Sequence, residues 1–297
     1  MSAPTYPGAV EPARQGFVDS GGVRIRVVEW GDAQAPPLLL CHGYWDHARS
    51  FALLAPLLAD RYRVVALDAR GHGDSDRAGN YTWATHVLDI VAVLSWIGAP
   101  AHLIGHSFGG GQVVDAACAA GDRARKVVNI DGFGPPPFTP EELAGTTARL
   151  STFLDQRRAA TQRPDWRPYA SLDQLIERRR AQNPLLTLEW LRYFVFHAAR
   201  QADDGWRWKA DPLLAHNAGP WVPEWIGLGY ARLQHPMLAV IGSVQDTWGP
   251  LPESILGPRL AGVRRLERAT VEGAGHFVHI ERPRETAALI RDYLEAA

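Results

Sequence analysis

Cysteine is scarce in this chain of 297 residues, which contains only Cys41 and Cys118. Because the two do not form a C-x-x-C pair, the sequence excludes a disulfide scaffold and a zinc ribbon and favours a reducing compartment. Lysine is as scarce: with Lys126 and Lys209 as the only lysines, 29 of the 31 basic residues are arginine. The formal net charge is −1. No global field therefore favours nucleic acid or an anionic membrane.

Long apolar runs and common ligand-binding motifs are missing as well. No apolar stretch approaches the 18 residues of a membrane span. The first residues lack the apolar segment of a secretory signal. There is no H-E-x-x-H pair for a metal and no complete phosphate-binding glycine loop for a nucleotide. We therefore expect a cytoplasmic globular protein with no metal, no cofactor, no nucleic-acid partner and no membrane span.

Short apolar runs alternate along the chain with segments of helical periodicity. Such alternation predicts an α/β fold with a mostly parallel central sheet flanked by helices. Thr82 is the expected N-cap of a helix that ends at Ile97. The expected strands are 23–28, 37–41, 63–67, 101–104, 126–130, 235–241 and 263–271, and the expected helices are 48–58, 82–97, 108–120, one from about 252, and 283–295.

The alternation stops at Gly134-Pro135-Pro136-Pro137 and resumes at His235. The segment between contains six of the eleven tryptophans and two capping-box patterns, which predicts helices. We interpret residues 134–232 as a helical cap, or lid, inserted into a core formed by residues 1–133 and 233–297. Within it, we expect the three arginines 178–180 to form a solvated helix face.

Residues 105–109, Gly-His-Ser-Phe-Gly, match G-x-S-x-G, the nucleophile elbow. The motif lies between an expected strand and an expected helix, and two further glycines follow it. Because each glycine inside a helix costs about 1 kcal/mol relative to alanine, close packing of strand against helix must require them. Ser107 is the predicted nucleophile.

Three further motifs occur in order around the elbow. They are Cys41-His42-Gly43-Tyr44-Trp45 after a strand, Asp68-Ala69-Arg70-Gly71-His72-Gly73-Asp74-Ser75, and Gly273-Ala274-Gly275-His276-Phe277. Together with the elbow they resemble the α/β-hydrolase superfamily, in particular its capped serine-hydrolase and esterase branch, over nearly the whole chain. The α/β-hydrolase fold is therefore expected.

Serine needs a base within hydrogen-bond reach, because it is a poor nucleophile at neutral pH. His276 lies in a glycine-flanked loop after the last expected strand, and we assign it that role. The resemblance implies that the backbone N–H groups of Phe108 and Tyr44 form the oxyanion hole. We place His42, Gly43, Trp45 and His106 at the substrate-binding site, with His42 supporting its turn and His106 packed beneath the elbow.

The acid of the triad has two candidates. Asp246 follows the strand after the expected cap, which is the family's usual position, and it gives the chain order Ser107, Asp246, His276. Asp131 follows the preceding strand, a position that some members of the superfamily use. We favour Asp246, with Asp131 as the alternative.

The sequence thus predicts a metal-independent serine hydrolase that cleaves a small-molecule carboxylic ester or lactone through an acyl-enzyme, as a monomer or homodimer. A serine in the elbow argues against the members that attack with aspartate, the haloalkane dehalogenases and epoxide hydrolases. Two alternatives stay open. One is a C–C bond hydrolase or lyase on the same triad, and the other is a ligand-binding receptor with slow turnover.

Overall fold

An eight-stranded sheet forms the centre of the protein in the computed structural model, which describes residues 4–162, 165–216 and 222–296. The strand order is β1-β2-β4-β3-β5-β6-β9-β10. The six strands from β4 to β10 are parallel, whereas β1 and β2 pair antiparallel at one edge. The strands are β1 (Arg14–Ser20), β2 (Val23–Trp30), β3 (Pro37–Cys41), β4 (Arg63–Leu67), β5 (Ala101–His106), β6 (Ala124–Ile130), β9 (Met237–Gly242) and β10 (Leu266–Val271).

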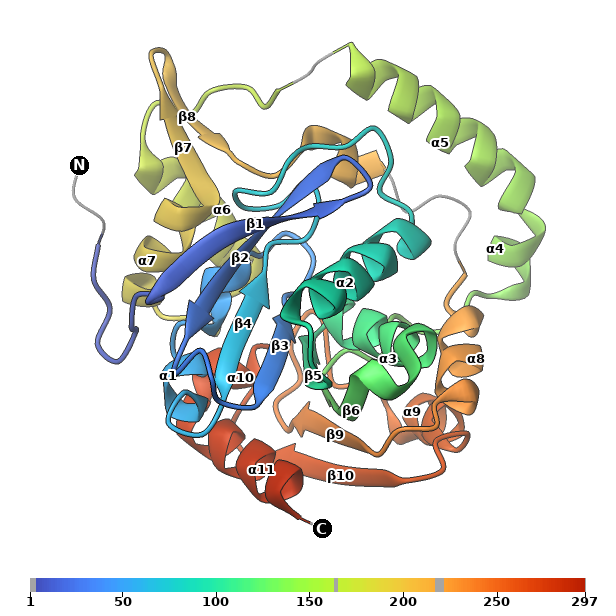
Figure 1. Cartoon of the computed structure of the whole chain (residues 1–297). Coiled ribbons are helices and arrows are strands. Elements are labelled where there is room, and N and C mark those ends of the chain that lie inside the picture. The colour runs from blue at the N-terminus through green and yellow to red at the C-terminus, as the bar shows by residue number, and fades with distance from the viewer. Residues whose placement is uncertain (1–3, 163–164, 217–221, 297) are drawn as a thin grey trace.

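Helices cover both faces of this sheet (Figure 1). Side chains of alternate strand positions enter two separate apolar clusters, one on each face. The first face is covered by α2 (Trp83–Ile97), α3 (Phe108–Ala120), α8 (Glu224–Arg232) and α9 (Glu253–Leu260), and the second by α1 (Ala55–Leu58), α10 (Val278–Glu281) and α11 (Pro283–Glu295). Within the described part of the chain, no helix has both the length and the apolar character needed to cross a membrane.

The sequence patterns explain most of these elements. β3, β5 and β9 are apolar runs that are buried on both faces, as parallel strands usually are. Thr82 caps α2 as predicted, and its side chain accepts the Thr85 backbone N–H. The mostly parallel α/β fold is confirmed. The helix predicted over 48–58 was wrong, because the chain forms a single 3₁₀ turn, η1 (Ala48–Phe51), and then the short helix α1.

The chain between β6 and β9 folds outside the sheet, and we call residues 134–232 the insertion. A two-stranded antiparallel hairpin lies among its helices, which the sequence patterns did not predict. Trp221, one of the six tryptophans counted above, lies outside the described residues. The elements are α4 (Pro140–Ala144), α5 (Thr146–Thr161), α6 (Leu172–Gln182), α7 (Leu188–Ala198), β7 (Ala199–Ala202), β8 (Gly205–Trp208), the 3₁₀ helix η3 (Pro212–His216) and α8.

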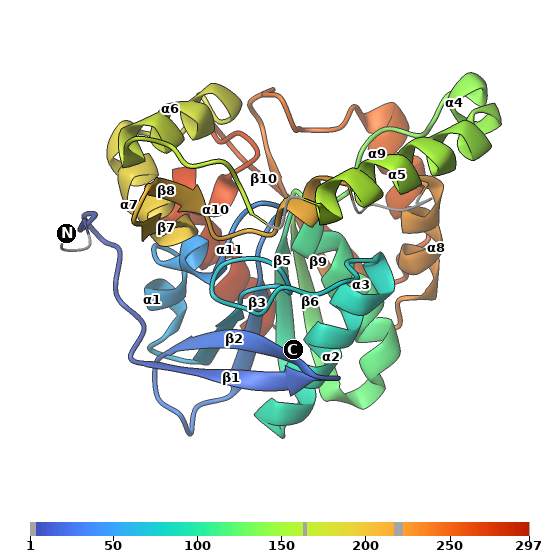
Figure 2. The same ribbon diagram turned by 90° about the horizontal axis from the view of Figure 1, so that it is seen from above.

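The part of the insertion from α4 to η3 lies across the end of the sheet to which β3, β5 and β6 point (Figure 2), whereas α8 packs on the first face of the sheet. Its two halves differ in packing. Helices α6 and α7 form an apolar cluster that includes Leu175, Trp190 and Phe194 together with Phe277 and Ile280 of the core. In contrast, Leu143, Leu150 and Leu154 of α4 and α5 are exposed.

Candidate active site

The carboxyl ends of the parallel strands converge on one edge, and Ser107 lies there between β5 and α3. Its backbone has φ 54° and ψ −119°, a conformation that side-chain-bearing residues rarely adopt. The Ser107 N–H donates to the Ile130 carbonyl (2.9 Å), and its own carbonyl accepts the Gly110 N–H (2.9 Å). The strained turn is therefore anchored by the neighbouring strand β6 and by the first turn of α3.

Two glycines of the elbow allow this turn to form. A β-carbon on Gly105 would lie 2.2 Å from the Gly109 carbonyl oxygen, and one on Gly109 would lie 2.3 Å from the Cys41 carbonyl oxygen. Both contacts are with backbone atoms, which cannot move aside. The glycines predicted to permit close packing of helix α3 against the strands thus do so.

Ser107 and His276 are in direct contact. His276 Nε2 lies 2.9 Å from Ser107 Oγ. The loop that carries His276 follows β10, and its imidazole is almost fully buried, with 8% of the side chain exposed. A base within hydrogen-bond distance of a serine hydroxyl is the arrangement that activates serine as a nucleophile.

The carboxylate behind His276 is that of Asp131. His276 Nδ1 lies 2.6 Å from Asp131 Oδ2. Asp246, which the sequence favoured, contacts the same residue differently: its Oδ2 accepts the backbone N–H of His276 (2.8 Å). The preference for Asp246 beside Nδ1 is therefore corrected. Both aspartates follow buried strands, and only their three-dimensional placement separates a contact with the ring from a contact with the backbone.

Asp246 and Glu281 together hold the backbone of the histidine loop. Glu281 accepts the N–H groups of Gly275 (3.0 Å) and Phe277 (3.2 Å), on either side of the N–H that Asp246 accepts. Three consecutive N–H groups are thus bound by two carboxylates. Such charge-assisted hydrogen bonds are stronger than neutral ones, so they fix the position from which the imidazole reaches Ser107.

Asp131 is itself buried, with only 8% of the residue exposed. Burial raises the pKa of the Asp131 carboxyl above its usual value, and the hydrogen bond with His276 acts in the opposite direction. Its backbone has φ 47°, and its N–H donates to the Val240 carbonyl of β9 (2.9 Å). The carboxylate is thus aimed at His276 by a turn anchored to the adjacent strand.

The loop after β3 lies against the elbow. A β-carbon on Gly43 would be 3.2 Å from Ser107 Cβ, so this glycine lets the loop approach the nucleophile. His42 uses both ring nitrogens on backbone groups: Nδ1 donates to the Gly43 carbonyl (2.7 Å) and Nε2 accepts the Ala69 N–H (2.9 Å). Burial lowers the pKa of His42 to about 4, so the ring stays neutral. His42 supports the turn, as expected, and its nitrogens are not free for a substrate.

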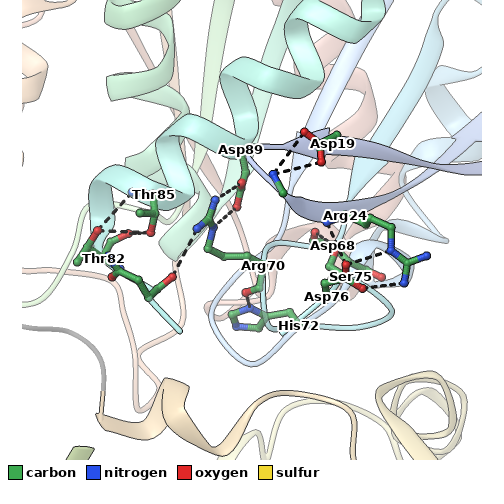
Figure 3. Close-up of polar contacts among 12 residues, drawn as sticks. Asp19, Arg24, Asp68, Arg70, His72, Ser75, Asp76, Thr82, Thr85 and Asp89 are labelled. Atoms are coloured by element: carbon green, nitrogen blue, oxygen red, sulfur yellow. Dashed lines mark hydrogen bonds and ion pairs between the residues drawn. The ribbon is translucent and has the colours of Figure 1, made fainter. Parts of the chain in front are cut away.

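The loop of residues 68–76 packs against this region, and its polar contacts are drawn in Figure 3. Asp68 accepts the Ala48 N–H (2.7 Å) and its carbonyl accepts the Ser75 hydroxyl (2.6 Å). Arg70 forms two 2.6 Å bonds to Asp89 of α2, and both side chains are buried. The Asp-x-Arg-Gly motif therefore braces the chain that follows β3.

Tyr44 and Phe108, the residues expected to supply the oxyanion donors, contact each other through their side chains. The Tyr44 and Phe108 rings meet edge to face, with centroids 4.8 Å apart. Phe108 opens helix α3, so its N–H has no acceptor within the helix. Tyr44 follows Gly43, on which a β-carbon would lie 3.2 Å from Ser107 Cβ. Both residues are therefore close to Ser107 along the chain or in space.

His106 and Trp45, the other predicted substrate-binding residues, differ in exposure. His106 is fully buried beneath the elbow, where Nε2 donates to the His276 carbonyl (3.0 Å). Burial lowers the pKa of His106 well below its usual value, consistent with a neutral ring. Trp45 is partly exposed, and its backbone has φ 64°. Of the two, only Trp45 has exposed surface.

Sequence reasoning missed three charged residues near the site: Asp46, Arg179 and Glu281. The first two form a buried ion pair. Glu281 lies two residues before the proline that starts α11, so the pattern indicated only a helix boundary. No motif distinguishes Arg179 from the arginines on either side of it.

A parallel α/β sheet whose elbow serine contacts a histidine, itself backed by an aspartate, defines the α/β hydrolases as a class. Residues 38–289 match the model of the alpha/beta hydrolase family. The chain belongs to this family.

Similar proteins span nearly the whole chain. A serine hydrolase-like protein of Danio rerio is 28% identical, over 91% of this chain and 85% of its own length. The sn-1-specific diacylglycerol lipase ABHD11 of Mus musculus is 24% identical, over 89% and 82%. Among solved structures, a thioesterase domain from the curacin biosynthetic pathway has a TM-score of 0.81 at 24% identity, over 94% of this chain and 99% of that domain.

Proposed function

We propose that this protein is a serine hydrolase that cleaves a carboxylic ester or lactone through an acyl-enzyme. The proposal rests on two contacts of His276. Its Nε2 lies 2.9 Å from Ser107 Oγ, and its Nδ1 lies 2.6 Å from Asp131 Oδ2. The acid in this proposal is Asp131. The similarity to a diacylglycerol lipase and to a thioesterase domain supports acyl transfer as the reaction class.

In the first half-reaction, Ser107 Oγ attacks the carbonyl carbon as its proton passes to His276 Nε2. The carbonyl oxygen becomes an oxyanion, which the N–H groups of Tyr44 and Phe108 stabilise. His276 then gives its proton to the departing alkoxide oxygen, and the acyl group stays on Ser107. Asp131 keeps the Nδ1–H tautomer and stabilises the imidazolium between these steps.

In the second half-reaction, water replaces the alcohol. His276 takes a proton from the water as its oxygen attacks the acyl carbon, and the second tetrahedral intermediate releases Ser107 and a carboxylic acid. A lactone reacts by the same steps, except that the alcohol and the acid stay in one product.

The insertion is proposed as the cap of this site. Its part from α4 to η3 lies across the end of the sheet where Ser107 is located (Figure 2). Trp166 of the insertion is close to Trp45, with ring centroids 5.9 Å apart. We propose that this side of the site receives the acyl or alcohol group.

A panel of p-nitrophenyl esters of increasing chain length and of lactones tests the function, with Ser107→Ala as the paired variant. With esters whose acyl-enzyme is hydrolysed more slowly than it forms, the wild type should show a burst of about one p-nitrophenol per chain, because p-nitrophenol leaves in the acylation step. Ser107→Ala should melt like the wild type and show no burst. Turnover near the wild-type rate in Ser107→Ala would rule out this mechanism, and cleavage of none of the esters or lactones would rule out the substrate class.

A further inference from the structure

Consecutive residues of the loop after β3 reach across to the insertion. Tyr44, Trp45 and His47 each contact a different part of it, and Asp46 between them forms an ion pair with it. Their partners are the Leu214 carbonyl for Tyr44 Oη (2.6 Å), the Trp166 ring for Trp45 (5.9 Å between centroids) and the Phe194 carbonyl for His47 Nε2 (3.0 Å). The loop that supplies an oxyanion donor is thus bound to the insertion at four successive positions.

Arg179 of α6 makes the charged contact in this set. Only 7% of Arg179 and 3% of Asp46 are exposed. Arg179 Nη2 pairs with Asp46 Oδ1, and Nη1 donates to the Trp45 carbonyl (3.3 Å). The guanidinium also lies over the Phe194 ring, 4.8 Å from its centroid. The expectation that residues 178–180 form a solvated face therefore holds for Arg178 and Arg180, which are exposed, and is wrong for Arg179.

The two groups that Arg179 holds belong to one tight turn. The Asp46 N–H donates to the Gly43 carbonyl (3.1 Å), which closes a turn over Tyr44 and Trp45. Trp45 takes the third position with φ 64°, where glycine or asparagine is the usual residue. A bulky side chain in this conformation is strained and persists only when its surroundings hold it. Arg179 binds the carbonyl of that strained residue and the side chain of the next.

The ion pair also lies beside the catalytic base. Asp46 Oδ2 is 3.8 Å from His106 Nδ1, and the other nitrogen of His106 donates to the His276 carbonyl. Arg179 in turn lies 5.9 Å from the centroid of the Phe277 ring, next to His276 in the chain. The pair is thus buried between the oxyanion loop and the histidine loop.

We infer that Arg179 is a positioning residue through which the insertion sets the Tyr44 N–H in the oxyanion hole. This inference rests on the proposed function, since it assigns Arg179 a part in the same transition state. If the turn relaxes, the Tyr44 N–H no longer points at the developing negative charge. The reaction then slows while binding of the neutral ester is little changed.

If Arg179 only docks the insertion, its replacement gives a different result. Stability would fall and substrate affinity would change, but binding of the transition state would not be selectively weakened. A short ester such as p-nitrophenyl acetate, together with a short alkyl trifluoromethyl ketone, separates the two. The ketone adds Ser107 Oγ at its carbonyl carbon as the serine proton passes to His276, and the resulting oxyanion occupies the same hole as the transition state.

The test compares Arg179→Met with Arg178→Met, its exposed neighbour on the same helix. We expect Arg179→Met to lower kcat about 10- to 100-fold with KM within threefold, which is less than the 10²–10³ that complete loss of an oxyanion donor costs. The inhibition constant of the ketone should rise by the same factor as kcat/KM falls. Arg178→Met should match the wild type, and Arg179→Lys should recover part of kcat.

Arg179→Met leaves the buried Asp46 without its partner and so threatens folding. The double variant Arg179→Met/Asp46→Asn removes both charges and carries the test if the single variant does not melt cooperatively, with the same loss of kcat expected. A kcat within twofold of wild type in the folded variant, a change confined to KM, or an unchanged inhibition constant for the ketone would each overturn the inference. A wild type that neither cleaves the ester nor binds the ketone would contradict the proposed function itself. A wild type that does both, with variants that show one of these results, would contradict only the role of Arg179.

Discussion

The loops after β6 and β9 each bring an aspartate to His276, yet the two carboxylates contact different parts of it. Asp131 at the end of β6 reaches the ring at Nδ1. Asp246 in the loop after β9 reaches the backbone N–H. Two adjacent parallel strands thus each supply one carboxylate that positions His276. One carboxylate orients the imidazole, and the other fixes the loop that carries it.

The largest effect should come from Asp131→Asn. The amide cannot hold the Nδ1–H tautomer or stabilise the imidazolium, so kcat should fall by about 10⁴. The melting temperature should change little, since asparagine has nearly the same shape. Ester hydrolysis and thermal melts measure both quantities. A loss below tenfold would mean that Asp131 is not the acid.

Gly249→Ala disturbs Asp131 without replacing it. A β-carbon at Gly249 would lie 2.6 Å from Asp131 Oδ2, so the carboxylate must shift away from Nδ1. Displacement of a catalytic group by about 1 Å can cost 10²-fold in rate, and we expect a loss of kcat of that order. Gly227→Ala is the matched control, because its β-carbon would meet no atom within 4 Å. Equal rates in both variants would contradict the assignment.

Asp246→Ala should affect stability more than chemistry. The carboxylate accepts the N–H groups of His276, Trp248 and Gly249, and loss of such bonds should cost about 1–3 kcal/mol of unfolding free energy. We expect kcat to fall no more than about tenfold. Urea unfolding and ester hydrolysis on the same preparation give the two numbers. A loss of kcat larger than that of Asp131→Asn would reverse the division of roles.

The smallest effect on catalysis is expected at His279, whose burial instead changes how stability depends on acid pH. Burial lowers the pKa of His279 to about 3 in the folded protein, below the value of about 6.5 in an unfolded chain. The unfolded state therefore binds the proton more readily. The stabilisation is complete above pH 6.5 and is lost as the pH falls toward 3.

His279→Phe removes this titration. Between pH 7 and pH 4 the variant should lose on the order of 3 kcal/mol less stability than the wild type, while kcat at pH 7 stays near wild type. Urea unfolding at the two pH values measures the difference. An unchanged pH dependence would show that His279 does not titrate as burial requires.

The sequence predicts the core of this molecule well because its signals are local. A few neighbouring residues are enough to recognise the apolar strands β3, β5 and β9 and the glycine-rich turn around Ser107. Ser107 and His276 are found in the same way. Both are expected at the carboxyl edge of the sheet because each follows a predicted strand.

Neither the triad acid nor Arg179 can be identified from a local sequence pattern. Asp131 and Asp246 both follow apolar strands, and the choice between them depends on a turn with φ 47° that no motif marks. Arg179 has the same side chain as its two neighbours, and the helical phase that buries it is set by packing of α6 and α7 on the core. The β7–β8 hairpin likewise forms within a segment whose caps predicted only helices.

The most direct test of the central claim is the site and rate of modification by an organophosphate such as diethyl p-nitrophenyl phosphate, followed by mass spectrometry of the digested protein. We expect one diethylphosphoryl group on Ser107. The rate of modification should fall about 10³-fold or more in Asp131→Asn and no more than about tenfold in Asp246→Asn. Modification of another residue, or a slower reaction in Asp246→Asn than in Asp131→Asn, would contradict a triad of Ser107, His276 and Asp131.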